Sequence, residues 1–235
     1  MHKPHLIVFG ASGGIGTALV NRLCDTFTLT AVSRDLSRLA ALPDSVRKIE
    51  ADATRPGEAA KAFAGIDSVD AVVNCIGNLF LKPLHRTSPA EFTDVMRIHV
   101  FSSFNILRES VENMPGGGSI ALMSSVAAGT GMVNHEAIAA AKGAIEGLTR
   151  SAAATYARRN IRINAVAPGL TETPMTARLT QGAAREVSEK MHPLGRLGTP
   201  DDIASALAWL IDPAQTWVTG QILHIDGGLG QIRTN

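Results

Sequence analysis

The chain of 235 residues is poor in several residue types, and each scarcity excludes a class of protein. It has only two cysteines, Cys24 and Cys75, which are too few for a disulfide framework and whose spacing fits no zinc site. No apolar run reaches the roughly 18 residues that a membrane-spanning helix needs. The 22 basic and 21 acidic residues leave a net charge of +1, so there is no basic field for nucleic acid. Aromatic residues make up 4% of the chain, and Tyr156 is its single tyrosine.

Apolar residues, by contrast, make up 45% of the chain, which together with the small net charge excludes extended disorder. The length fits one or two domains, and without a linker or an internal repeat we expect one domain over residues 1–235. The first residues, MHKPH, lead into the apolar LIVFG without the pattern of a signal peptide. We therefore expect a cytoplasmic protein with two reduced, buried cysteines, no metal site, and neither a nucleic-acid nor a membrane partner.

Short apolar runs alternate with helix-like stretches along the chain. Seven runs predict strands, at residues 6–9, 29–32, 46–51, 70–75, 119–123, 161–167 and 221–225. Helices are predicted at residues 15–25, 36–41, 58–64, 89–112, 136–158 and 200–211. Several strands are apolar on both faces, whereas 46–51 alternates and fits an edge. The order predicts an α/β fold with a Rossmann-type, doubly wound parallel sheet and helices on both faces. Residues 171–193 form the one long insertion, which we interpret as a substrate lid.

The sequence GASGGIG, at residues 10–16, joins the first predicted strand to the first predicted helix. Gly10, Gly14 and Gly16 permit a tight turn and let backbone amides approach a pyrophosphate, to which the N-terminus of the helix adds partial positive charge. Ser12 and Ile15 lie in the same turn. A glycine-rich turn alone is weak evidence, but its place between a strand and a helix favours a dinucleotide site over a plain loop.

The end of the second predicted strand discriminates between two cofactors. An acid at this place bonds the ribose hydroxyls of NAD, whereas an arginine accommodates the 2′-phosphate of NADP. The sequence AVSRD places Ser33 and Arg34 there, so we expect NADP(H) rather than NAD(H). The alternative is that Ser33 or Asp35 caps the next helix and that Arg34 is merely solvated.

These motifs together resemble the short-chain dehydrogenase/reductase family, and the general pattern is nearest to bacterial 3-oxoacyl-carrier-protein reductases. The resemblance runs from GASGGIG through NCIG (74–77) and RINAVAPGLTETPM (162–175) to the tail segments PLGRLGTPDDIASALAWLI and VTGQILHIDGG. It implies an oxidoreductase of carbonyl and alcohol groups that forms a homodimer or homotetramer through the helices at 89–112 and 136–158. It also implies cofactor-binding roles for a further set of residues: Asp52, Ala53, Asn74, Gly77, Lys142, Pro168, Gly169, Thr171 and Thr173.

The same resemblance identifies the catalytic centre, which departs from the family at two positions. Members of the family work with a serine, a tyrosine and a lysine, supported by an asparagine. The serine position holds Ser125, with Ser124 beside it as an alternative count, and the lysine position holds Lys142. The tyrosine position, four residues before Lys142, holds Ile138, and the asparagine position holds His99. Tyr156 lies 18 residues further along the predicted helix, about 27 Å away, and cannot replace the missing acid.

Histidines are the candidate substitutes for the missing acid, because an imidazole near its ordinary pKa is a competent acid at neutral pH. The candidates are His99 and His135, each of which also has an ordinary interpretation. His99 fits a hydrogen-bonded core histidine, and His135 with Glu136 fits a helix start; His192 in the lid is a weaker candidate.

Two functions of different classes remain open. The first is an NADP(H)-dependent oxidoreductase with impaired or non-standard proton transfer, in which Ser125 polarises the substrate and a histidine or water supplies the proton. The second is a catalytically inactive relative, kept as a cofactor sensor or as a partner subunit. A positioned general acid contributes about 10²–10⁴-fold, so losing the tyrosine leaves room for slow chemistry.

Overall fold

The seven strands form one parallel sheet in the computed structural model, which describes residues 3–233. The strand order is β3-β2-β1-β4-β5-β6-β7, and every neighbouring pair is parallel. The strands are β1 (His5–Phe9), β2 (Thr28–Ser33), β3 (Arg47–Glu50), β4 (Ala71–Asn74), β5 (Gly118–Met123), β6 (Ile161–Pro168) and β7 (Ile222–Ile225). This is the doubly wound sheet that the sequence predicts, and the alternating strand β3 lies at one edge as expected.

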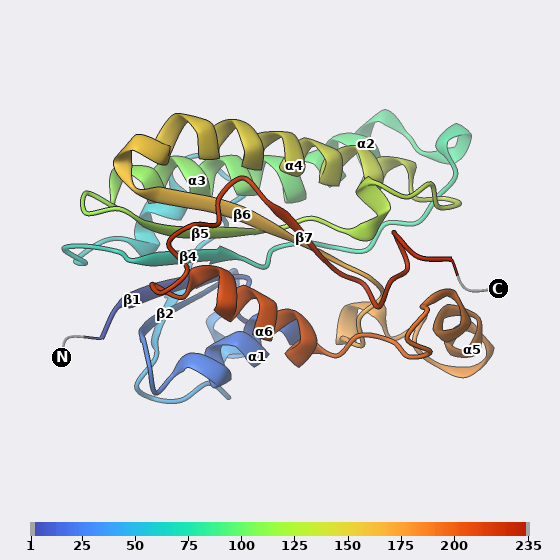
Figure 1. Ribbon diagram of the computed structural model, residues 1–235, viewed down its shortest axis with the longest axis horizontal. Coiled ribbons are helices and arrows are strands. Elements are labelled where there is room, and N and C mark those ends of the chain that lie inside the picture. Colours follow the sequence, from blue (N-terminus) through green and yellow to red (C-terminus); the bar gives the residue numbers. More distant parts are fainter. Residues whose placement is uncertain (1–2, 234–235) are drawn as a thin grey trace.

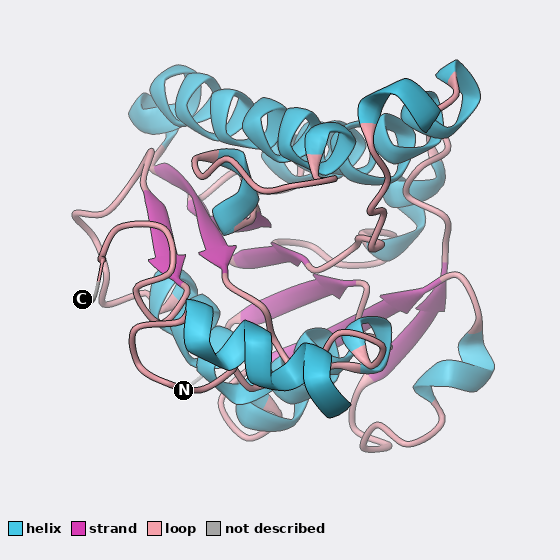
Figure 2. Cartoon of the chain, turned by 90° about the vertical axis from the view of Figure 1, so that its right-hand side faces the viewer, coloured by secondary structure: helices cyan, strands magenta, loops and turns pink. Residues whose placement is uncertain are grey.

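Helices cover both faces of the sheet (Figures 1 and 2). Helices α1 (Gly14–Leu23) and α6 (Pro200–Ile211) pack against each other on one face. The opposite face carries α3 (Ser102–Glu112) and α4 (Glu136–Tyr156), with α2 (Pro89–Met96) at one end of that layer. Helix α5 (Gly182–Met191) stands apart from both layers, beyond the end of the sheet (Figure 1).

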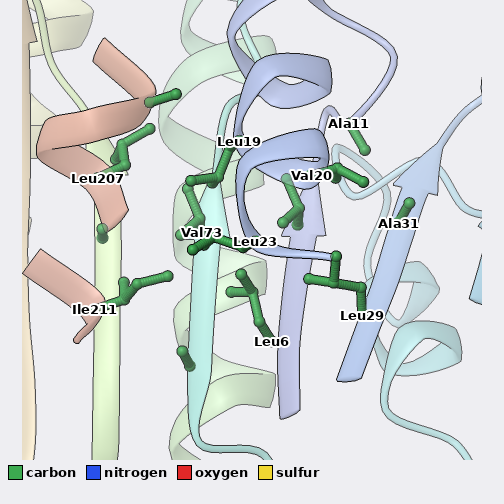
Figure 3. Close-up of a cluster of buried hydrophobic side chains, with 14 of the residues drawn as sticks. Leu6, Ala11, Leu19, Val20, Leu23, Leu29, Ala31, Val73, Leu207 and Ile211 are labelled. Atoms are coloured by element: carbon green, nitrogen blue, oxygen red, sulfur yellow. The ribbon is translucent and has the colours of Figure 1, made fainter. Parts of the chain in front are cut away.

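Two apolar layers hold these helices to the sheet, because successive side chains of a strand point to opposite faces. Leu6 and Val8 of β1 join the layer under α1 and α6, where Figure 3 shows Leu19 and Leu207. Ile7 and Phe9 of the same strand belong to the layer under α3 and α4. Apolar residues in consecutive positions of one strand thus reflect burial on both faces.

Three predicted helices differ from the structure. The single helix expected over 89–112 is divided by a π-helical stretch, Arg97–Phe101. Just after it, the hydroxyls of Ser102 and Ser103 donate to the backbone carbonyl oxygens of Ile98 and His99, and bonds of this kind loosen the regular ladder. The segments expected at 36–41 and 58–64 are 3₁₀ turns, Leu36–Leu39 and Glu58–Ala62, because they are too short to sustain an α-helix.

The two cysteines agree only in part with what the sequence predicts. Cys24 and Cys75 are both free thiols, as expected, but both residues are half-buried rather than buried. Within residues 3–233, none of the helices has the length and apolar character needed to cross a membrane. Residues 1–2 and 234–235 of the domain range 1–235 lie outside the described residues.

Candidate active site

The sequence-predicted site residues gather where the strands of the sheet have their carboxyl ends. Because all seven strands are parallel, these ends lie on the same side of the molecule. Gly10 follows β1, Ser33 ends β2, Asn74 ends β4 and Gly169 follows β6. The strand order reverses between β1 and β4, and ligands of doubly wound sheets bind at such a switch point.

The glycine turn is packed too tightly for side chains. Gly10 has a φ of 74°, and a Cβ there would lie 2.8 Å from the carbonyl carbon of Cys75. A Cβ on Gly16 would lie 2.4 Å from the carbonyl oxygen of Gly10. Helix α1 then starts at Gly14 with no side-chain cap and no acid in its first turn. Its N-terminal amides are therefore left for an anion such as a pyrophosphate, so the residues present fit a dinucleotide.

The second strand ends in a polar corner next to this turn. The Ser33 hydroxyl lies 3.1 Å from that of Ser12, and Arg34 beyond it is exposed. The carboxylate of Asp35 accepts from the backbone N–H and the hydroxyl of Ser37, and so caps the 3₁₀ turn. Asp35 is thus the cap that the alternative interpretation names, whereas the Ser33 hydroxyl accepts from the backbone N–H of Asp35 and Arg34 is exposed.

Asp52 and Ala53 follow β3 at the same corner. Burial opposes ionisation of Asp52, but hydrogen bonds from Thr54 outweigh it, and with the nearby Arg34 they lower the pKa of the carboxyl. The carbonyl oxygen of Ala53 accepts from the side chain of Asn105. A negative Asp52 beside a positive Arg34 gives this corner both an acceptor and a cation.

Asn74 and Gly77 shape the segment after β4. The buried Asn74 accepts from the backbone N–H of Ile76 and donates to the hydroxyl of Ser103. A Cβ on Gly77 would lie 3.0 Å from Cε1 of His99. The segment is thus held against the π-helical stretch that carries His99.

The two serines after β5 have different tasks in the structure. The Ser124 hydroxyl is buried and donates to the carboxylate of Glu146 at 2.9 Å. The Ser125 hydroxyl accepts from the backbone N–H of Ala127 and stays half-buried, so its own proton remains available to a ligand. The geometry favours Ser125 over Ser124 as the serine that meets a substrate.

Ile138, which the resemblance places at the tyrosine position, belongs to an apolar cluster. It lies in the first turn of α4, and its side chain is only 5% exposed. The cluster around it consists of Phe80, Val95, Met96, Val100, Ala127, Met132, Ala137 and Ala141. Tyr156 is the last residue of the same helix, where its ring packs near Arg159. The structure therefore brings no tyrosine to the site.

Lys142 lies one turn after Ile138 and points to the end of β5. Its Nζ donates to the carbonyl oxygen of Met123 at 2.7 Å, and the residue is 5% exposed. Burial lowers the pKa of Lys142 to about 7, although the interaction with Cys75 raises it. Met123 lies two residues before Ser125, so Nζ and the Ser125 hydroxyl belong to the same strand end.

The two histidines offered as substitute acids lie in different surroundings. His99 is 1% exposed, and burial followed by the charge of Lys142 lowers its pKa to about 2. Its Nε2 lies 2.9 Å from Oδ1 of Asn78, while Nδ1 is buried without a partner among the described residues. His135 is the residue before α4, and its Nδ1 lies 2.8 Å from the carbonyl oxygen of Val133.

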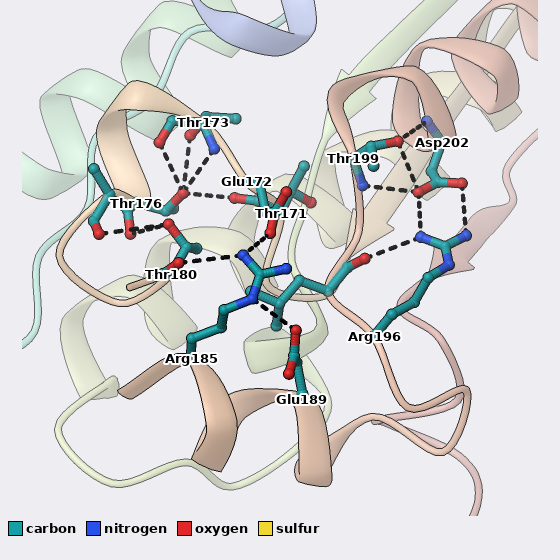
Figure 4. A network of polar contacts seen from close by, with 12 residues as sticks. Thr171, Glu172, Thr173, Thr176, Thr180, Arg185, Glu189, Arg196, Thr199 and Asp202 are labelled. Carbon is teal, nitrogen blue, oxygen red and sulfur yellow. Dashed lines mark hydrogen bonds and ion pairs between the residues drawn. The ribbon is translucent and has the colours of Figure 1, made fainter. Parts of the chain in front are cut away.

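The insertion at 171–193 returns to the glycine turn. Thr173 caps the 3₁₀ turn Pro174–Thr176, and its Cγ2 would lie 3.0 Å from a Cβ on Gly14. Figure 4 shows Arg185 of α5 pairing with Glu172 and with Glu189, which ties the helix back to the strand end. The insertion therefore covers the start of α1, the place expected for the pyrophosphate.

His192 at the end of this insertion, which the sequence offers only as a weaker candidate acid, is a positioning residue in the structure. Its Nε2 accepts from the backbone N–H of Leu170 at 3.2 Å, and its Nδ1 lies 2.7 Å from the carbonyl oxygen of Ser188. A Cβ on Gly169 would lie 2.8 Å from the same Nε2. His192 thus fixes the chain after Pro168, which ends β6, and no sequence pattern signals such a bond.

Asn78 and Cys75 also escape sequence reasoning as site residues. Asn78 holds the ring of His99, and Cys75 interacts with Lys142 from the end of β4. Both lie within a few residues of the NCIG segment, which is the signal that could have indicated them. Among residues 3–233, no group of three or more His, Cys, Asp or Glu side chains is arranged to hold a metal ion.

A doubly wound sheet with a glycine turn at its switch point and a serine and lysine at the next strand end defines a class: the dinucleotide-dependent oxidoreductases. A family model described as enoyl-(acyl carrier protein) reductase matches residues 10–230. The chain belongs to the short-chain dehydrogenase/reductase family. Its relatives are dehydrogenases and reductases of carbonyl and alcohol substrates, and members of the family bind NAD or NADP.

Three of its relatives illustrate the similarity. Carbonyl reductase family member 4 of Danio rerio is 35% identical, over 95% of this chain and 96% of that protein. The 3-oxoacyl-[acyl-carrier-protein] reductase FabG of Aquifex aeolicus is 30% identical, over 95% and 96%. A short-chain type dehydrogenase/reductase from Mycobacterium ulcerans has a similar structure, with a TM-score of 0.92, 26% identity, and coverage of 99% of this chain and 92% of that chain. The chain thus resembles 3-oxoacyl-carrier-protein reductases along nearly its whole length.

Proposed function

We propose that this chain is an NADP(H)-dependent oxidoreductase of carbonyl and alcohol groups with non-standard proton transfer. The observation that carries the proposal is the buried Lys142, whose Nζ donates to the carbonyl oxygen of Met123, two residues before Ser125. Burying a lysine is costly, and a functional site at a strand end gives a reason for it. A reduced nicotinamide would supply the hydride for the carbonyl carbon.

The residues proposed to hold the cofactor follow its length. The pyrophosphate would meet Gly10, Ser12, Gly14, Ile15 and Gly16, where α1 presents free amides. Asp52, Ala53, Asn74 and Gly77 would enclose the adenine end and the segment after β4. The nicotinamide end would be held by Lys142, Pro168, Gly169, Thr171 and Thr173. The insertion at 171–193 acts as a lid in this proposal, because Thr173 already lies against Gly14.

The catalytic roles divide between two residues. The Ser125 hydroxyl polarises the substrate carbonyl, since its proton is not used by the protein itself. Lys142 holds the nicotinamide ribose through Nζ. Ile138 supplies no proton, so the rate of the chemical step is lower than a positioned tyrosine would give.

The preference for NADP(H) rests on the corner formed by Ser12, Ser33 and Arg34. The two hydroxyls are neighbours, and the exposed guanidinium lies beyond them, which is the donor set that a 2′-phosphate requires. Asp35 is the only acid in the segment 33–37, and its carboxylate already accepts a hydrogen bond from the backbone N–H of Ser37.

Calorimetry with an Arg34→Ala variant tests this preference. Charge-assisted hydrogen bonds contribute about 1.5–3 kcal/mol, so we expect the NADPH affinity to fall roughly tenfold to a hundredfold and the NADH affinity to stay the same. Arg38→Ala is the matched control, because Arg38 is an equally exposed arginine four residues later. An equal loss for both cofactors, or a loss in the control, contradicts the assignment of Arg34.

The proposal includes a homo-oligomer and a cytoplasmic location. A homodimer or homotetramer would form through α2, α3 and α4, where small residues such as Ala140 and Gly147 permit close helix packing. A cytoplasmic location fits the two free thiols.

A second candidate function is a catalytically inactive cofactor sensor or partner subunit. The observation that favours it is the double departure at the centre, an apolar Ile138 and a His99 that burial keeps neutral. Binding of NADPH without any consumption of it by carbonyl compounds would favour this function over the first.

A further inference from the structure

The ammonium group of Lys142 is buried without a counter-ion. Nζ has the Met123 carbonyl oxygen as its hydrogen-bond partner, and within residues 3–233 no carboxylate forms an ion pair with it. Burial of this kind favours the neutral amine and lowers the pKa of Lys142 to about 7, with Cys75 opposing the shift. The group therefore exchanges a proton with its surroundings near neutral pH.

The groups that face Lys142 from other elements stay neutral over the same range. Burial raises the pKa of the Cys75 thiol, at the end of β4, to about 12. Burial and then the charge of Lys142 lower the pKa of His99, in the π-helical stretch, to about 2. On α4 itself, Glu146 accepts from Ser124 and pairs with Arg150. Lys142 is thus the member of this cluster that changes charge near pH 7.

The ring of His99 adds a buried nitrogen, Nδ1, to this cluster. Nε2 meets two groups of Asn78: it lies 2.9 Å from Oδ1, and the backbone N–H of Asn78 donates to it at 3.4 Å. Nδ1 is buried and has no partner among the described residues. A buried ring nitrogen without a partner in residues 3–233, near enough for the charge of Lys142 to lower the pKa of His99, marks a place where a polar ligand atom completes the hydrogen bonding.

We infer that Lys142 is itself the proton donor of this site, in addition to holding the cofactor. The inference rests on the proposed function and names the source of the proton. When the carbonyl carbon receives its hydride, Nζ of Lys142 gives a proton to the carbonyl oxygen that Ser125 polarises. One C–H bond and one O–H bond form on the substrate. The C=O π bond and one N–H bond of Lys142 break, together with the C–H bond of the reduced nicotinamide that would supply the hydride and its electron pair. A solvent proton then recharges the neutral amine. Ile138, one turn earlier, has no proton to give.

This assignment fixes the sign of the pH dependence. Reduction uses the charged lysine, so kcat is at its plateau below the pKa of Lys142 and falls about tenfold per pH unit above it. Alcohol oxidation uses the neutral amine and has the opposite dependence. The pKa of the bound state governs kcat, whereas that of the free protein governs kcat/KM.

A Lys142→Arg variant tests the role directly. Arginine keeps a positive charge and hydrogen-bond donors but does not release a proton at neutral pH. We expect kcat for NADPH-dependent ketone reduction to fall by about 10²–10⁴-fold while calorimetry still detects NADPH binding. Lys61→Arg is the matched control, because Lys61 is an exposed lysine paired with Glu58, and its kcat and pH profile stay those of the wild type.

A titration that needs neither cofactor nor turnover gives the second readout. The chain has six lysines, so ¹³C-labelled lysine side chains can be followed individually by NMR. We expect one resonance to titrate near pH 7, to be absent from the Lys142→Arg spectrum, and to stand apart from the others near about 10.4.

Three results would overturn the inference alone: a Lys142 resonance that titrates with the other lysines, a wild-type kcat that is flat across neutral pH, or a Lys142→Arg variant that keeps the wild-type kcat and profile. A wild-type protein that binds NADPH but reduces no carbonyl compound would instead refute the proposed function, and this inference with it.

Discussion

Replacing Ile138 with tyrosine puts a proton donor at the position where the family resemblance places the acid, and we expect the Ile138→Tyr variant to reduce ketones faster than the wild type. The full contribution of a positioned acid is about 10²–10⁴-fold, or about 3–5 kcal/mol of the barrier. With Lys142 already giving a proton, the gain lies at the lower end, about 10²-fold. Ser125 and Lys142 are in place at the adjoining strand end to serve the new hydroxyl.

The larger side chain has a cost that the structure lets us bound. Ile138 is 5% exposed in an apolar cluster, so a ring must displace neighbours at about 1–3 kcal/mol. Several of these neighbours, among them Phe80 and Met132, are only partly buried and have room to move. A domain has about 5–15 kcal/mol of stability, so the variant should remain folded.

The assay is the loss of NADPH absorbance with a panel of ketones, aldehydes and 3-oxoacyl thioesters, run on the folded variant. Ile138→Phe is the matched control, because it adds the same ring without the hydroxyl and should show no gain. A folded Ile138→Tyr without any gain means that the pocket has been rebuilt around isoleucine. An equal gain in Ile138→Phe would show that ring packing, and not a proton, limits the wild type.

Two further predictions concern the frame of the site. Gly10→Ala forces a Cβ to 2.8 Å from the Cys75 carbonyl carbon at a positive φ. We therefore expect the free energy of unfolding in chemical denaturation to fall by more than about 1 kcal/mol, and NADPH binding to be lost in calorimetry. Wild-type stability and wild-type binding would contradict the tight turn. Asp202→Asn weakens the cap of α6, where the carboxylate accepts from Arg196 and Thr199, and should cost about 1 kcal/mol at neutral pH. Hydrogen bonding to Arg196 lowers the pKa of Asp202 in the folded chain. The difference in free energy of unfolding between the wild type and Asp202→Asn should therefore shrink as the pH falls below about 4. A difference that is independent of pH would count against the cap.

The fold could be predicted from the sequence because its strands are apolar on both faces. Runs such as Leu6 to Phe9 are buried from two sides, and this leaves a continuous signal that few other structures produce. The π-helical stretch Arg97–Phe101 could not be predicted, because an apolar periodicity does not report one extra residue in a helical turn. It is followed by hydroxyl hydrogen bonds from Ser102 and Ser103 to the carbonyl oxygens of Ile98 and His99, and bonds of this kind depend on side-chain geometry.

Site residues could be predicted where the backbone conformation requires one residue type. They were harder to predict where the role of a residue depends on side chains that are distant in the sequence. Gly10 must be glycine in any sequence that makes this turn, so the motif indicates it. The choice between Ser124 and Ser125 depends on Glu146, which lies 22 residues further along the chain and reaches one hydroxyl only. The neutral state of His99 depends on burial by elements that the sequence does not place together.

The measurement that tests the central claim most directly is NADPH consumption by the purified wild-type protein with the same panel of carbonyl compounds. The account predicts slow, saturable, substrate-dependent oxidation of NADPH that declines as the pH rises through neutrality. Tight binding of NADPH with no consumption above the protein-free rate, for any ketone, aldehyde or 3-oxoacyl thioester, would contradict it.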